Sequence, residues 1–259
     1  MESKTIKKTL ILLLLLGGCT DPTDDRSQVS NLHCEYGKYT GEINAKNVPH
    51  GKGKMTYHDG RVYEGDFVEG VPHGKGKGIK PGVCVIEGDF EGGSPNGKVK
   101  ITYADGIIYE GEYTDILPHG KGKKLYPDGT IYEGDWWRGG PHQKVKMKCP
   151  DRTVYEGDFV LAKIQGKGKL TYPDGSIVEG EFVEGWQNGK GKRTCPDGVY
   201  RGTFRNGKQQ GKIKKECNDG KIVYGDFVNC KMPIATIDSG VGSERGRRNV
   251  YVFRKTPGR

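Results

Sequence analysis

Pairs of carboxylates one residue apart are the side chains of this sequence best suited to acid–base chemistry. Glu64 with Asp66 and Glu110 with Glu112 are examples, and on a strand such residues point to the same side. Two neighbouring carboxylates can act as general acid and general base. Similar pairs recur in six places along the chain. A pair that recurs in nearly every similar segment is architectural, so we expect no catalytic site.

Histidines are the second set of residues that could do chemistry, as metal ligands. One position of a repeated segment holds His50, His73, His119 and His142, and in other segments Asn96, Gln165 and Asn188. A metal site needs donor atoms that converge, which side chains one repeat apart do not provide. We predict no metal, no cofactor and no intrinsic enzyme activity, and a shared hydrogen-bonding role for this loop position.

The carboxylate pairs surround a glycine that recurs at a nearly fixed interval of 22 to 24 residues. Nine such copies indicate a stacked repeat protein. We predict a structural role for each of these glycines, which are Gly41, Gly65, Gly88, Gly111, Gly134, Gly157, Gly180, Gly202 and Gly225.

Each repeat has the pattern of two short antiparallel strands. Tyr63-Glu64-Gly65-Asp66-Phe67 is followed by a loop and by Gly74-Lys75-Gly76-Lys77, and Asp-Gly dipeptides such as Asp59-Gly60 separate the units. Asp-Gly is a strong hairpin signal. Side-chain alternation places aromatic rings over glycines on one face, and carboxylates beside lysines on the other. The expected fold is all-β, an elongated, single twisted sheet of about nine tandem β-hairpin repeats.

The pattern Tyr-Glu-Gly-Glu-Trp, Gly-x-Gly and Tyr-x-Asp-Gly at a period of 23 resembles the MORN (membrane occupation and recognition nexus) repeat over about residues 36–232. The resemblance implies an elongated hairpin array used as a scaffold for protein assembly and, in several members, for contact with membrane lipids. It does not by itself imply an enzyme.

The N-terminus has the features of an export signal. Lys4, Lys7 and Lys8 precede the apolar run 10–16, which is too short to span a bilayer. The following Gly17-Gly18-Cys19 resembles the lipobox of bacterial lipoproteins, which implies lipid attachment at Cys19. An ordinary signal peptide with an incidental cysteine is the alternative. By resemblance to enteric lipoproteins, Thr20 after the cysteine favours the outer membrane, with the array facing the periplasm or the cell surface.

These signals predict four segments. Residues 1–18 form a lipoprotein signal peptide, and residues 19–35 form a lipidated cysteine with a flexible tether. Residues 36–235 form the repeat array. Residues 236–259 form a basic tail that either is disordered or adds a last edge strand.

Six cysteines follow Cys19, an even number that in an exported chain is compatible with disulfides. Four of them, Cys34, Cys149, Cys195 and Cys217, share the repeat position held elsewhere by tyrosines such as Tyr57. Equivalent positions lie about 9–10 Å apart, too far for a disulfide bond. We interpret these four as small apolar fillers and leave open a disulfide that involves Cys84 or Cys230.

Charge is unevenly distributed in a chain with a formal net charge of +9. Residues 19–185 hold 22 basic and 26 acidic side chains, whereas residues 186–215 hold nine basic side chains and Asp197 alone. Arg201 and Thr203 stand where Glu179 and Glu181 stand one repeat earlier. The candidate anion- or lipid-binding residues are Lys190, Lys192, Arg193, Arg201, Arg205, Lys208, Lys212, Lys214 and Lys215. The alternative is a solvated basic edge that keeps the protein soluble.

Three functional hypotheses follow. The leading one is a non-enzymatic, lipid-anchored scaffold for protein–protein interaction at the bacterial cell envelope. The second is a membrane-contact or bridging module that binds anionic lipid through the basic C-terminal repeats, with an acidic glycan as another candidate partner. The third is a role accompanying an enzyme. Export makes nucleic acid the least expected partner.

Overall fold

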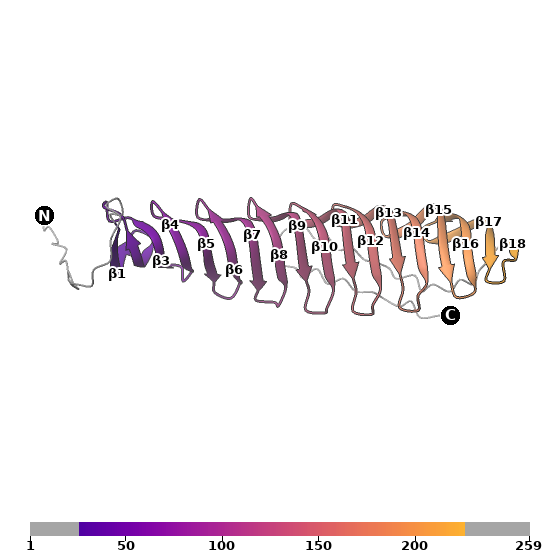
Figure 1. Ribbon diagram of the computed structural model, residues 1–259, viewed down its shortest axis with the longest axis horizontal. Coiled ribbons are helices and arrows are strands. Elements are labelled where there is room, and N and C mark those ends of the chain that lie inside the picture. The colour runs from indigo at the N-terminus through magenta and orange to yellow at the C-terminus, as the bar shows by residue number, and fades with distance from the viewer. Residues whose placement is uncertain (1–25, 226–259) are drawn as a thin grey trace, which may run out of the picture.

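The computed structural model describes residues 26–225, which form a single sheet of 18 strands and contain no helix (Figure 1). Accordingly, no helix in this part of the chain is long and apolar enough to cross a membrane. The strands are β1 (Ser27–Cys34), β2 (Gly37–Ile43), β3 (Pro49–Tyr57), β4 (Val62–Val68), β5 (Val71–Lys80), β6 (Cys84–Glu91), β7 (Ser94–Tyr103), β8 (Ile108–Thr114), β9 (Leu117–Leu125), β10 (Ile131–Trp137), β11 (Gly140–Lys148), β12 (Val154–Val160), β13 (Lys163–Thr171), β14 (Ile177–Val183), β15 (Trp186–Cys195), β16 (Gly198–Arg205), β17 (Lys208–Cys217) and β18 (Ile222–Gly225).

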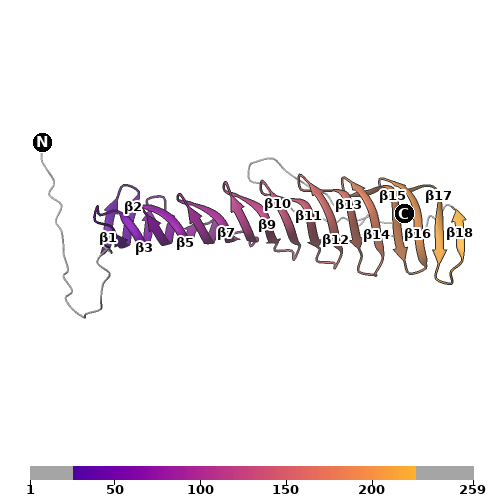
Figure 2. The same ribbon diagram turned by 45° about the horizontal axis from the view of Figure 1, so that its top comes forward.

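Every strand pairs antiparallel with the next strand in the sequence, from β1 to β18. The result is an open, elongated meander whose strands lie across the long axis (Figures 1 and 2). This confirms the predicted all-β fold built as one sheet of repeated hairpins.

The sheet begins earlier than the repeat spacing predicted. Strand β1 lies inside the segment 19–35 that we expected to be a tether, and it pairs with β2. Leu32 and Cys34 alternate with polar residues, Val29 precedes them across a bulge, and all three pack against the first core cluster. This short apolar alternation is sufficient to add an edge strand. Residues 1–25 and 226–259, which include the predicted signal peptide, Cys19 and the basic tail, lie outside the described residues.

The Asp-Gly dipeptides form the turns between repeats, as predicted. Tyr57 N donates to Arg61 O across the turn at 2.8 Å, and the Asp59 carboxylate accepts from Arg61 N at 3.1 Å. Gly60 has a φ of +83°, which favours glycine at this point. The same arrangement recurs at Asp128 and at later turns.

A bulge bends each hairpin near its other end. Gly65 pairs with Gly76, but the next residue, Asp66, pairs with His73, so two residues of β5 are skipped. One of these is Gly74, whose φ of +60° is in the left-handed region. The Asp66 carboxylate accepts a hydrogen bond from Lys75 N at 3.1 Å. The acidic residue of the motif therefore stabilises the bulge, a role that the sequence pattern did not predict.

Aromatic rings lie over glycines on one face of the sheet, as predicted. A Cβ atom on Gly76 would lie 2.3 Å from the Tyr63 hydroxyl oxygen and 2.5 Å from carbons of its ring. The Tyr63 hydroxyl donates to the carbonyl oxygens of Asp66 and His73, each at 3.1 Å. The Tyr63 ring also packs edge-on against Phe67 and Phe90, with centroids 5.1 and 4.9 Å apart. This thin aromatic layer is the core.

The cysteine interpretation is partly wrong. Cys34, Cys84, Cys149 and Cys217 are free thiols, and Cys149 is a buried core residue. Cys195, which we expected to be an apolar filler, is disulfide-bonded. The spacing between equivalent repeat positions excludes pairing only within the column of cysteines. It does not restrict a bond from Cys195 to a sulfur outside that column.

Candidate functional site: the charged face and the hairpin ridge

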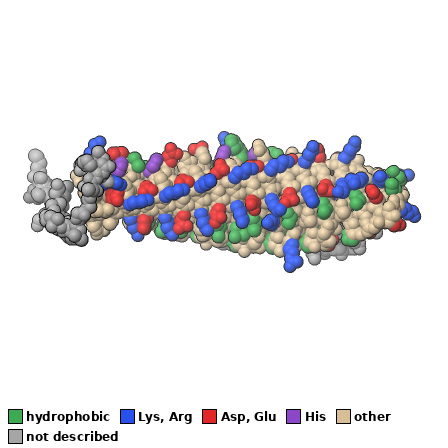
Figure 3. Space-filling model, in the orientation of Figure 1, with side chains coloured by type: hydrophobic (Ala, Val, Ile, Leu, Met, Phe, Trp, Pro, Cys, Tyr) green, Lys and Arg blue, Asp and Glu red, His purple; other side chains and the backbone are tan. Residues whose placement is uncertain are grey.

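Lysines and carboxylates cover the face opposite the aromatic layer, in two rows along the array (Figure 3). Between β3 and β4, Lys52 Nζ lies 2.6 Å from a carboxylate oxygen of Asp66, and Lys54 Nζ lies 3.6 Å from one of Glu64. The equivalent pairs further along are Lys75–Asp89, Lys77–Glu87, Lys100–Glu110, Lys121–Asp135, Lys144–Asp158 and Lys146–Glu156. We call this arrangement the ionic ladder.

Lysines of the ionic ladder lower the pKa of the carboxylates of Glu87, Asp89 and Glu156. The hydrogen bond from Lys77 lowers the pKa of Glu87, and the hydrogen bond from Lys75 lowers the pKa of Asp89. A general acid that works near neutral pH needs the opposite shift, a raised carboxyl pKa. The pair Glu87 and Asp89 has the shift opposite to that of a general acid. Glu64, Asp66 and Glu110, which the sequence singled out, are ion-paired with lysines and belong to the ladder.

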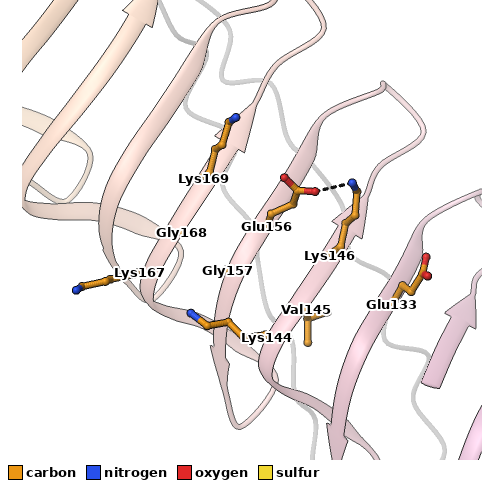
Figure 4. A pocket seen from close by; sticks show the side chains of 9 residues that line it. All are labelled: Glu133, Lys144, Val145, Lys146, Glu156, Gly157, Lys167, Gly168 and Lys169. Carbon is orange, nitrogen blue, oxygen red and sulfur yellow. Dashed lines mark ion pairs between the residues drawn. The ribbon is translucent and has the colours of Figure 1, made fainter. Parts of the chain in front are cut away.

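The strip between the two rows is recessed. Around Val145, Gly157 and Gly168 it forms an open hollow of about 530 Å³. Four lysines and two glutamates rim the hollow, and Lys146 is ion-paired with Glu156 (Figure 4). The strip is shallow because side chains leave the strands only in the two rows beside it.

The ionic ladder ends at the basic C-terminal strands. Arg201 on β16 lies directly between Lys192 on β15 and Lys214 on β17. In the same way, Thr203 replaces a carboxylate opposite Lys190. Lys192 keeps one ion pair, with Glu179 at 2.8 Å. Three cations thus stand side by side on neighbouring strands, where the earlier repeats alternate in sign. We call Lys192, Arg201 and Lys214 the cationic row.

Two of the nine predicted anion-binding residues lie on the aromatic face. Arg193 donates from Nε to the Gln187 side-chain oxygen at 2.8 Å, and its guanidinium lies 4.3 Å from the Phe204 ring centroid. Burial lowers the pKa of Arg193. Lys215 Nζ donates to Asp197 at 2.7 Å, which lowers the pKa of that carboxyl. The sequence could have predicted that Arg193 and Lys215 face the aromatic layer, because they share the repeat position of Met55, Ile101 and Met147, which are buried.

The other seven predicted residues divide between the charged face and the strand ends. Lys190, Lys192, Arg201 and Lys214 lie on the charged face, since their register partners there are ladder positions. Lys212 lies in the bulge of β17, at the repeat position of Lys75, which faces Asp89 in the ladder. Arg205 and Lys208 pair with each other beside the hairpin turn and are exposed. The nine basic residues therefore do not form one surface.

The histidine positions contribute to the hairpin loops. His119 packs against Trp137 with ring centroids 4.8 Å apart, and Asn188 at the equivalent position accepts a hydrogen bond from Asn206 N at 3.2 Å. Between residues 26 and 225 no group of three or more His, Cys, Asp or Glu side chains is arranged to hold a metal ion.

An exposed apolar ridge follows the loops at one edge of the array, and sequence reasoning missed it. Backbone hydrogen bonds such as Gly70 N to Pro49 O, at 2.8 Å, connect several of the loops to the preceding hairpin. The apolar residues flank turns on both sides, a signal that the sequence does contain. We define the hairpin ridge as Val68, Val71, Ile116, Leu117, Trp137, Val160, Leu161 and Val183, which are 41% to 73% exposed.

The predicted repeat glycines occupy the strand pairs as expected, with Gly65 opposite Gly76 and Gly111 opposite Gly122. Exceptions occur where the partner is larger: Gly88 faces Val99, and Gly134 faces Val145. A branched side chain there occupies space that a tyrosine ring fills in the other repeats. Gly225 is the last residue of β18.

Comparison with known proteins identifies the repeat. A family profile described as the MORN repeat matches residues 45–60, 63–77, 87–108, 109–131, 155–177, 179–199 and 200–221. No curated protein matches the chain.

Among solved structures, the SAS-4 TCP domain of Drosophila melanogaster, in complex with a proline-rich motif of Ana2, is similar at 13% identity and a TM-score of 0.37, covering 83% of this chain and 97% of that one. An inactive virginiamycin B lyase from Staphylococcus aureus, with quinupristin, is similar at 14% identity and a TM-score of 0.17, covering 82% and 76%. Scores this low carry no conclusion about this chain.

Proposed function

The chain belongs to the MORN-repeat family, and from this premise we propose a non-enzymatic scaffold that is attached by lipid to the bacterial cell envelope and binds protein partners along its array. Repeats of this family are generally non-enzymatic. Members of such repeat families present long surfaces to which other macromolecules bind.

The hairpin ridge is the observation that carries the proposal. Leu161 is 73% exposed, Ile116 is 67% exposed and Trp137, the last residue of β10, is 46% exposed, all at the hairpin turns of the same edge. Contiguous exposed apolar side chains rimmed by charge are typical of protein-binding surfaces. The backbone hydrogen bonds that connect several of these loops to the preceding hairpin restrict their motion, which lowers the entropic cost of binding.

The ionic ladder supports a scaffold in a second way. Its rows are neutral over most of the array, so the charged face keeps the molecule soluble without attracting one sign of charge. The hairpin ridge is then the surface on which a bound partner would bury the most apolar area.

An affinity pull-down from envelope extracts tests the scaffold. The variant Trp137→Ser with Leu161→Ser should lose the partners that the unchanged chain captures. Val83→Ser is the matched control, because Val83 is equally exposed, at 44%, but lies in the turn after β5 at the opposite edge. Equal capture by both variants, or no enriched partner at all, would contradict the proposal.

The lipid anchor needs a separate measurement. Mass spectrometry of the mature N-terminus should find acyl groups on Cys19, and Cys19→Ser should release the protein from membranes. A mature chain that starts elsewhere, or Cys19→Ser protein that remains in the membrane fraction, would contradict this part. Outer-membrane localisation is part of the same proposal and is checked by membrane fractionation.

A further inference from the structure

The cationic row carries an inference that does not depend on the anchor or on the hairpin ridge. Lys192, Arg201 and Lys214 are direct register partners on β15, β16 and β17. Side chains paired in this way have Cβ atoms about 5 Å apart, and like charges at that separation destabilise a sheet. In the earlier repeats a carboxylate occupies the position of Arg201, as Glu64 does between Lys54 and Lys77.

The surroundings of the row increase its positive potential. Lys190 lies in the second row, about 7 Å away along the strand, and is the register partner of Thr203. Lys212 has the repeat position of the second-row residue Lys75 and lies in the bulge of β17. Arg201, Lys190 and Lys212 form no ion pair among the residues that the structure describes. The strands remain paired because the opposite face is filled by Phe204, Ile213 and other buried side chains.

The shape of the surface favours a chain over a flat partner. Cations stand in two lines on either side of the strip, along which Gly191 and Gly202, which have no side chains, are register partners. The hollow around Gly157 and Gly168 belongs to the same strip. A linear polymer can enter such a strip, whereas a membrane surface would contact only the tips of the two lines.

The polar and aromatic neighbours favour a sugar chain. Thr203 and Gln210 are opposite each other and exposed, so they can bind hydroxyl groups. Tyr224 on β18 is the register partner of Lys214 and is 68% exposed, which gives a ring on which a sugar can stack. Single-stranded nucleic acid requires aromatics for successive bases. Among the described residues of β15–β18 this face carries two rings, Tyr224 and the partly buried Trp186 at the hairpin end of β15, which are too far apart in register for successive bases.

We propose that the charged face of β15–β18 is a binding site for a linear acidic polysaccharide, with the cationic row and Lys212 binding its carboxylates and Tyr224 stacking against a sugar ring.

Calorimetric titration with polygalacturonate tests the site, using the full chain with Cys19→Ser so that no lipid is attached. Binding should weaken as salt rises, and Arg201→Glu should weaken it at least tenfold, or 1.4 kcal/mol. Arg201→Glu restores the carboxylate of the other repeats, so the variant is expected to fold. Lys100→Glu is the matched control, since it makes the same charge change in the same row of the ionic ladder.

Three further probes make the result specific. Tyr224→Leu should weaken polygalacturonate binding but not polyphosphate binding, because only the sugar stacks on the ring. Neutral dextran should not bind. Anionic phospholipid vesicles should bind more weakly than polygalacturonate.

The proposal is overturned if polygalacturonate does not bind, or if Lys100→Glu weakens binding as much as Arg201→Glu. It is equally overturned if polyphosphate or single-stranded DNA binds more tightly than the glycan. Vesicle binding that exceeds glycan binding and is lost in Arg201→Glu would instead support the membrane-contact alternative.

Discussion

The hairpin of β4 and β5 and the hairpin of β16 and β17 share one backbone design but differ on both faces. In the first, Tyr63 lies over Gly76, and Glu64 stands between two lysines. In the second, Ile213 lies against Gly202, and Arg201 stands between two cations. The two strands of each hairpin are antiparallel, and the register shifts near the motif glycine in both. The shift lies between Gly65 and Asp66 in the first hairpin and between Arg201 and Thr203 in the second.

The difference teaches that the backbone design and the surface charge are separable. Turn and strand glycines, with an apolar filling on one face, are present in both hairpins. The ionic ladder is present in only one of them, so it is not needed for strand pairing. Its interruption at β16 is therefore open to a functional explanation, whereas its repetition elsewhere is explained by stability and solubility.

The largest expected effect tests the aromatic face. Gly76→Ala would place a Cβ within 2.5 Å of the Tyr63 ring and hydroxyl, so we expect a loss of about 3 kcal/mol. The equivalent Gly191→Ala meets the Gln187 side-chain nitrogen, the flexible end of that residue, and should cost about 1 kcal/mol. Urea unfolding with hydrogen exchange resolved by strand would measure both. Gly191 belongs to the hairpin of β14 and β15, next to that of β16 and β17, so equal losses would show that the aromatic face is filled in the same way in the N-terminal and C-terminal repeats.

A variant that copies the C-terminal charge pattern into the centre of the array should have an intermediate effect. Glu110 lies between Lys100 on β7 and Lys123 on β9, so Glu110→Arg creates a second three-cation row. The variant should be less stable than the unchanged chain, because like charges then face each other. It should also raise the number of polygalacturonate chains bound from one to two, measured by titration. Unchanged stoichiometry would mean that the cations alone do not make the site.

The smallest effect appears only at high pH. Burial raises the pKa of Tyr39 and of Tyr63 from 10.0 to about 12. The folded state holds these protons more tightly than the unfolded state, so their contribution to stability is complete below pH 10 and is lost as the pH rises through about 12. The N-terminal core cluster holds both residues, whereas the C-terminal cluster has only Tyr200.

We therefore expect alkaline pH to destabilise the N-terminal strands before the C-terminal strands. The ultraviolet absorbance of ionised tyrosine, together with hydrogen exchange by strand, would measure it. Tyr63→Phe should move the transition to higher pH. Simultaneous loss of all strands would contradict the difference between the two clusters.

Much of the fold followed from local sequence. The Asp-Gly dipeptides predicted the turns, because glycine accepts the positive φ that Gly60 adopts. The alternation of Tyr63 and Phe67 with Glu64 and Asp66 predicted the two faces correctly. The edge strand β1 was missed, because its alternation is short and lies outside the repeat period.

The candidate site was predictable only in part. Composition identified the basic segment but did not separate Arg193 and Lys215, which face the aromatic layer, from Arg201. The bond of Cys195 was also missed, because repeat spacing constrains only equivalent positions. The hairpin ridge was missed because its members are far apart in sequence and meet only along one edge.

The sequence by itself determined the repeat, the turns, the alternating faces and the concentration of positive charge near the C-terminus. These features depend on local backbone preferences and on a period that every unit repeats. Only the tertiary structure decided which cations stand opposite one another, because that depends on register across strands and on the bulges that shift it. The pairing of β15, β16 and β17 places Lys192, Arg201 and Lys214 side by side, where the other repeats alternate lysine and carboxylate.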